Sequence, residues 1–85
     1  MEFTIIAGSS STKTKVSAVT GNTIGVLMYK VGAGLTLPSL GDSSIGYTAL
    51  TLNTDITCTS GNKIIVAEVF MDTIYGADID DVVVA

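Results

Sequence analysis

The apolar residues of this 85-residue chain fall in short runs rich in Val, Ile, Thr and Tyr, and clusters of Gly, Asn, Asp and Ser separate the runs. Nowhere do they recur at helical spacing over three turns. Alternation along short runs is typical of strands, whose successive side chains point to opposite faces. The pattern predicts strands at 3–7, 13–20, 23–31, 47–53, 56–60, 63–71 and 73–85, with a shorter candidate at 35–37.

About seven short strands with turn residues between them is the spacing of a small sandwich or barrel. We therefore expect one all-β domain over residues 1–85. Residues 23–31 are apolar on both faces, which predicts a central strand. Residues 32–46 hold four glycines and the only proline, and they predict a long connection across one end or edge of the domain.

Two Gly-Asn dipeptides precede similar strands. Gly21-Asn22 and Gly61-Asn62 both begin the pattern Gly-Asn-x-Ile-x-Val. The pattern indicates either a duplicated ligand-binding loop or two similar hairpin turns. Glycine adopts positive φ readily, and turn chemistry alone explains Gly-Asn before a β-branched strand, so we predict hairpin turns.

The charge of the chain argues against two classes of partner. It has eight acidic residues, four lysines and no arginine, for a net charge of −4. Nucleic-acid binders gain most of their affinity by neutralising phosphates with Lys and Arg, and an anionic membrane surface attracts the same residues. No apolar run approaches the roughly 20 residues of a spanning helix. We expect neither nucleic acid nor a membrane as a partner.

The residues that most catalytic sites require are missing. The chain has no histidine, so it can build neither a Ser-His nor a Cys-His nucleophile. Its single cysteine, Cys58, alternates with Ile56 and is predicted to be a buried small hydrophobe rather than a reactive thiol. The Gly32-Ala33-Gly34 run lacks the Gly-Lys-Ser/Thr ending of a phosphate-binding loop. We expect a protein that is not an enzyme and uses no cofactor.

The only charge cluster lies near the C-terminus. In a strand, Asp78 and Asp80 share one face and Asp81 lies on the other. Such carboxylates most often keep an edge strand from pairing with stray chains. The alternatives are a calcium site at Asp78 and Asp80, and an acid-base pair acting on a glycosidic bond.

The C-terminal segment also supplies the candidate interface residues. Tyr75 is the aromatic residue expected to be exposed, whereas Tyr29 and Tyr47 are expected in the core or on a strand face. An apolar terminal strand can pair with another copy by strand exchange. The predicted interface residues are Ile74, Tyr75, Val82 and Val84.

Two segments carry a resemblance to a known group of proteins. Residues 16–32 (VSAVTGNTIGVLMYKVG) and 47–71 (YTALTLNTDITCTSGNKIIVAEVFM) resemble the short immunoglobulin-like domains of tailed-phage virion proteins, including head decoration and head-fibre proteins. The likeness consists of strand spacing, Gly-Asn turns and an Ile-x-Val-x-Glu-Val strand at 64–69. The chain departs from the pattern at 70–75.

The resemblance implies a small immunoglobulin-like antiparallel β-sandwich without catalysis. It implies a homo-oligomeric accessory protein on the capsid surface of a bacteriophage virion, made in the host cytoplasm and bound to capsid or other virion proteins. The composition agrees, because only 14% of residues are charged and a surface rich in Ser, Thr and Gly suits coverage by neighbours. The alternative is an adhesive carbohydrate-binding immunoglobulin-like module, with calcium at Asp78 and Asp80 if it needs a metal.

Overall fold

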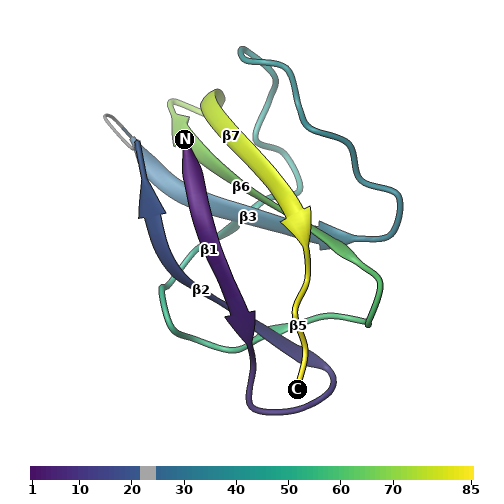
Figure 1. The fold of residues 1–85 in the computed structure, drawn as a ribbon. Helices are drawn as coiled ribbons and strands as arrows, with labels where there is room; N and C mark the ends of the chain where they lie inside the picture. Colours follow the sequence, from purple (N-terminus) through teal and green to yellow (C-terminus); the bar gives the residue numbers. More distant parts are fainter. Residues whose placement is uncertain (22–24) are drawn as a thin grey trace.

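The computed structural model describes residues 1–21 and 25–85, which form an all-β domain (Figure 1). Two antiparallel sheets face each other, with strand orders β1-β2-β5 and β4-β3-β6-β7. Two facing antiparallel sheets of three and four strands form a small β-sandwich, which confirms the predicted all-β sandwich class. The strands are β1 (Glu2–Ala7), β2 (Lys13–Thr20), β3 (Val26–Gly32), β4 (Thr48–Ala49), β5 (Ile56–Thr57), β6 (Lys63–Phe70) and β7 (Thr73–Asp81).

Four of the predicted runs fold at nearly their predicted positions, and the two middle runs are shorter in the structure. Strands β1, β2, β6 and β7 match their predicted positions to within a residue or two, except that β7 ends at Asp81. Only Thr48–Ala49 and Ile56–Thr57 of the two predicted middle strands are paired. Residues 35–37 form no strand. In the ranges that the structure describes, no helix is long and apolar enough to cross a membrane.

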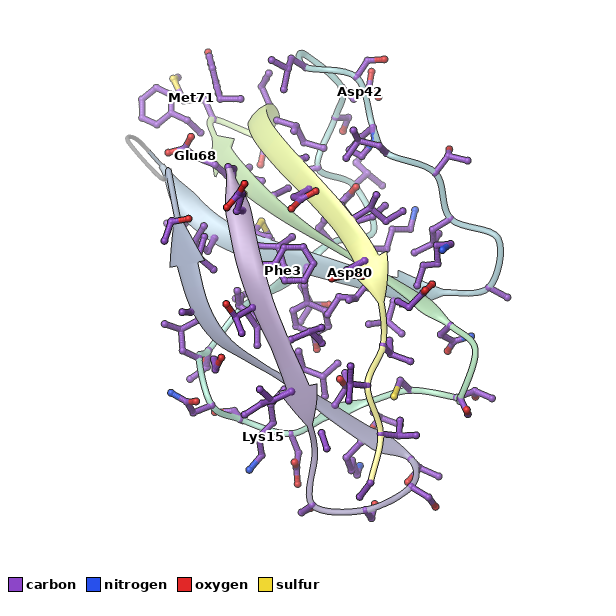
Figure 2. The ribbon with its side chains drawn as sticks, in the orientation of Figure 1. Phe3, Lys15, Asp42, Glu68, Met71 and Asp80 are labelled. Atoms are coloured by element: carbon purple, nitrogen blue, oxygen red, sulfur yellow. The ribbon has the colours of Figure 1, made fainter. Side chains whose placement is uncertain are left out.

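The main core lies between the two sheets. Strand β2 contributes Val16, and β6 contributes Ile64 and Val66 from alternate positions. Phe3 extends from β1 into the same space (Figure 2) and packs against this core. Because β3 and β6 are the two inner strands of their sheet, the predicted central position of β3 is confirmed.

A second, smaller core covers the outer face of the four-stranded sheet. It consists of Ala67, Val69 and Ile74, with Met28, Tyr47 and Ala77 packed against it. The connection 33–47 is tied to the edge of β7 beside this core. The backbone N–H of Gly41 donates to the carbonyl of Ile74 at 2.8 Å, and the N–H of Ile74 donates to the carbonyl of Asp42 at 2.9 Å. Strand β6 is consequently buried on both faces.

The strands that flank each Gly-Asn dipeptide do not pair as hairpins. Strands β2 and β3 belong to different sheets, and so do β5 and β6, so the chain passes from one sheet to the other between the strands of each pair. Gly21 has a φ of +78° and Gly61 a φ of +90°, as turn glycines do. Asn22 lies outside the described residues, while Asn62 closes a turn by donating its N–H to the carbonyl of Thr59 at 2.9 Å. The turn at Gly61-Asn62 is confirmed, and the predicted pairing of the flanking strands is wrong at both dipeptides.

The tight hairpin of the molecule joins β6 to β7 through Met71 and Asp72. Their φ values are +51° and +62°, and Phe70 pairs with Thr73 across the turn. Two successive residues with positive φ define a type I′ turn, which favours Asn-Gly. Neither Met nor Asp is the preferred residue, so the backbone at this turn is strained.

Replacing the pair by the preferred turn residues is expected to stabilise the protein. The double variant Met71→Asn/Asp72→Gly should gain about 1 kcal/mol in free energy of unfolding, because glycine adopts positive φ without a steric penalty. Urea unfolding followed by circular dichroism measures the change. The matched control is Ser10→Asn/Ser11→Gly in the β1–β2 loop, where neither residue has a positive φ. An equal gain in both double variants would contradict the turn assignment.

One exposed carboxylate fastens the β1–β2 loop to the segment before β5. Asp55 accepts hydrogen bonds from the hydroxyl of Ser9 and, at 3.0 Å, from its backbone N–H. The side-chain bond is the largest cause that lowers the pKa of Asp55 below its ordinary 3.8, followed by the backbone bond and the charges of Lys15 and Lys13. The charged form of Asp55 is therefore favoured in the folded state.

This contact predicts a stability difference that depends on pH. A carboxyl whose pKa is lower in the folded state contributes stability above its unfolded pKa and loses it as pH falls through the folded value. The melting temperature of Asp55→Asn should therefore lie below that of the unmodified protein above pH 3.8 and approach it in more acidic solution. Thermal unfolding across this range tests the effect, with Glu2→Gln as the charge control. A gap that stays constant with pH would refute it.

The chain after β7 crosses from one sheet to the other. The N–H of Val82 donates to the carbonyl of Asn62 at 3.0 Å, and the N–H of Val83 donates to Thr14 Oγ1 at 3.3 Å. Val82 packs against the main core. Figure 1 shows this tail running to the end of the sandwich that holds the β1–β2 loop, opposite the β6–β7 hairpin.

Candidate functional site

The acidic residues lie on an edge strand, as predicted. Asp78 is opposite Val66 and Asp80 is opposite Ile64, so these two carboxylates share a face, while Asp81 lies opposite Lys63 on the other. Asp81 forms an ion pair with Lys63 at 2.6 Å. Figure 2 shows Asp80 near the end of β7.

The described residues around Asp78 and Asp80 supply few of the oxygen ligands that a calcium ion needs. In residues 1–21 and 25–85, no group of three or more His, Cys, Asp or Glu side chains is placed to hold a metal ion together. Calcium takes about six to eight oxygen ligands. One oxygen each of Asp78 and Asp80 already accepts the next backbone N–H, at 2.9 and 2.8 Å. Calcium at Asp78 and Asp80 remains a prediction without a surrounding ligand set.

Of the predicted interface residues, Tyr75 is the one that the fold leaves well exposed. The register passes from Ile74 opposite Val69 to Gly76 opposite Glu68, so Tyr75 is the extra residue of a β-bulge. Ile74 is only 1% exposed and cannot contact a partner in this fold, because it belongs to the second core. Val82 and Val84 are half-buried.

The exposed tyrosine is part of a larger apolar surface at the β6–β7 hairpin. Tyr75 is 49% exposed, Phe70 46% and Met71 81%. The rings of Phe70 and Tyr75 meet edge to face, with their centroids 6.1 Å apart. Figure 2 shows Met71 at the extremity of the molecule. We call these three residues the apolar tip; the exposed Val26 begins the neighbouring strand β3.

Cys58 is buried, which confirms its predicted place in the structure. Burial raises the pKa of its thiol, and the nearby charge of Lys13 opposes this shift only in part. A buried thiol with a raised pKa has little thiolate at neutral pH. Cys58 therefore acts as a small apolar core residue.

A pocket of about 330 Å³ lies between the outer face of the four-stranded sheet and the connection 33–47. Its polar lining includes Lys30, Thr36, Asp42, Ser43 and Tyr47. Leu35, Pro38, Ile45, Ile65 and Ile74 contribute apolar surface. We call it the loop pocket. It combines an ammonium group, a carboxylate and several hydroxyl groups at one place on the surface.

Two charged groups set the electrostatics of the loop pocket. The Nζ atom of Lys30 lies 5.7 Å from the centroid of the Tyr47 ring, within the range of a cation–π contact. Burial, and secondarily the charge of Asp42, raises the pKa of the Tyr47 hydroxyl. Tyr47 is therefore a neutral hydroxyl group at physiological pH.

The sequence pattern gave no direct indication of this pocket. Lys30 is a single charged residue in an apolar strand. Asp42 lies in the connection that was predicted only to cross one end or edge of the domain, with no binding role. The available signal was the apolar content of that connection, from which Leu35, Pro38 and Ile45 line the pocket. The hydrogen bonds of the connection to β7 bring these residues together.

Comparisons with protein-family models, with curated proteins and with solved structures found no match. The resemblance to virion domains therefore remains a prediction from the sequence.

Proposed function

We propose that this chain is a non-enzymatic structural subunit of a larger assembly. The resemblance in the sequence suggests the capsid surface of a tailed-phage virion, where the subunit would decorate the shell or attach a fibre. The observation that carries the proposal is the apolar tip, at which Met71 is 81% exposed beside Phe70 and Tyr75.

Exposed apolar side chains of this size favour contact with a partner. Covering them contributes roughly 25 cal/mol for each Å² removed from water, and aromatic residues are common anchors of protein interfaces. Because only 14% of the residues are charged, removing the surface from water costs little free energy of desolvation. Many weak contacts of this type, repeated over a shell, give strong attachment by multivalency.

The sheet edges indicate where strand contacts with a partner could form. The edge of β7 is covered near its start by Gly41 and Asp42, interrupted by the bulge at Tyr75 and acidic towards its end. Strand β1 is an edge of the three-stranded sheet, and Glu2 is its one charged residue. Self-association through a strand is therefore expected at β1 rather than at β7.

The test compares two variants that add the same charge at opposite ends of the sandwich. Met71→Glu alters the apolar tip, and Ser11→Glu alters the β1–β2 loop; both positions are exposed. Each purified protein is mixed with phage shells stripped of surface proteins and sedimented. We expect Met71→Glu to lose at least about tenfold in shell affinity and Ser11→Glu to bind normally, with nearly unchanged melting temperatures.

Light scattering of the free proteins completes the experiment. Binding to shells by the unmodified chain with loss in Met71→Glu supports the proposal. A monomer that binds no shell protein would overturn the virion role. Binding that is insensitive to Met71→Glu would show that the apolar tip is not the attachment surface.

A further inference from the structure

The loop pocket has a chemistry that the assembly role does not use. The apolar tip lies at the β6–β7 hairpin, whereas the pocket lies under the connection 33–47. Its volume of about 330 Å³ is at the small end of the range of small-molecule sites. An occupant would be the size of one or two sugar rings.

The ammonium group of Lys30 is available to a ligand. Within the described residues, the ion pairs at 4.0 Å or less are Lys15–Asp55 and Lys63–Asp81, so no carboxylate lies within that distance of the Lys30 ammonium group. Lys30 extends from the inner strand β3, opposite Ile65 of β6, and the preceding residue Tyr29 pairs with Thr48 of β4. The donor is thus placed on a rigid part of the fold.

The carboxylate of Asp42 is fixed by the connection itself. Its Oδ2 atom accepts the backbone N–H of Ser39 at 3.0 Å, and its side chain is part of the pocket lining. Ser43 and Tyr47 add hydroxyl groups to the same lining. The pocket therefore offers donors and acceptors close to apolar surface from Leu35 and Pro38.

The mixed lining of the loop pocket favours some ligand classes over others. A wholly apolar ligand would desolvate Lys30 and Asp42 without giving either a new partner, which is costly. A polyanion would meet a lining with one ammonium group and one carboxylate, on a chain of net charge −4. A sugar ring fits both kinds of lining, because adjacent hydroxyl groups donate to a carboxylate and accept from an ammonium group while the C–H face packs on apolar side chains.

We infer that the loop pocket is a saccharide-binding site in which Lys30 and Asp42 hydrogen-bond neighbouring hydroxyl groups of one sugar ring. Tyr75 and Asp80, expected to matter for a carbohydrate-binding role, line no part of this pocket. The inference does not depend on the assembly role, because a protein that never joins a shell can bind sugar here.

The experiment is a nuclear magnetic resonance titration of the full chain, labelled with ¹⁵N. The probes are the methyl glycosides of glucose, galactose, mannose, N-acetylglucosamine and N-acetylgalactosamine, added to tens of millimolar. We expect at least one glycoside to give saturable shifts at the amides of Lys30, Ile65 and the connection 33–47. The spectrum itself reports whether each variant is folded.

Variants then assign the contact. Lys30→Met keeps most of the length of the side chain and removes the donor, and it should weaken binding about tenfold. Lys63→Met removes an ammonium group outside the pocket and should leave the affinity unchanged. No saturable shift at the pocket with any glycoside would overturn the inference, as would saturable shifts centred on Tyr75 or equal losses in the two lysine variants. A shell-binding failure has no bearing on these outcomes.

Discussion

A chain that ends at Asp72 is expected to be unfolded. Strand β7 pairs with β6 from Phe70–Thr73 to Lys63–Asp81, so its removal would expose the ladder of the most buried strand in the protein. Ile74 would leave the second core and Val82 the main core. Small domains have about 5–15 kcal/mol of total stability, and these losses together exceed that range.

The measurement is an NMR spectrum of the truncated chain, which should lose its amide dispersion. The control is a chain that ends at Val82. It keeps β7 and gives up the hydrogen bonds from Val83 to Thr14 and from Ala85 to Ser10, the latter 3.4 Å long. It should fold with a loss of about 1–2 kcal/mol. A dispersed spectrum from the chain ending at Asp72 would show that β7 is not integral to the sandwich.

This result also decides how assembly can be tested. The sequence suggested that residues 73–85 exchange between copies, and removing them would then dissociate a multimer. In the structure that deletion removes core residues, so a lost multimer would not locate an interface. Truncation after Val82 and substitution at Met71 leave the core intact and separate folding from assembly.

The fold class followed from the sequence because alternation is a local signal of sheet structure. Residues 13–20 alternate and form β2, and the continuously apolar run 63–71 forms the doubly buried β6, both at nearly those bounds. Strand pairing is decided by which faces the whole chain can bury, and a Gly-Asn turn does not reveal whether the next strand continues the same sheet. For this reason the turns at Gly21 and Gly61 were assigned to hairpins and prove to be crossings.

The turn of the β6–β7 hairpin escaped prediction for the opposite reason. Met71 and Asp72 adopt positive φ although neither has the turn preference of Asn or Gly. The buried strands on either side fix their pairing and impose the turn on these residues. The loop pocket escaped prediction because Lys30, Asp42 and Tyr47 are far apart in the sequence and meet only when the connection docks on the sheet.

The second large effect is expected in the main core. Ile64→Ala removes three carbon atoms from a side chain with no exposed surface between the sheets. Such truncations lower the free energy of unfolding by about 2–5 kcal/mol, because buried apolar surface is lost and a cavity remains. Thermal unfolding should show a decrease of about 15 °C in melting temperature for a domain of this size. Val83→Ala, on the exposed tail, should change it by less than about 3 °C.

Ile74→Ala applies the same chemical change to the second core. Ile74 is 1% exposed because the connection 33–47 covers it, whereas Ile64 is buried between the two sheets. A cost similar to that of Ile64→Ala therefore requires the connection to be packed firmly on β7. A cost near that of Val83→Ala would mean that the connection is loosely placed. The loop pocket would then lack its wall, since Asp42, Ser43 and Ile45 all come from that connection. The two isoleucine variants thus test the packing between the sheets and the packing of the connection 33–47 that forms one wall of the proposed saccharide site.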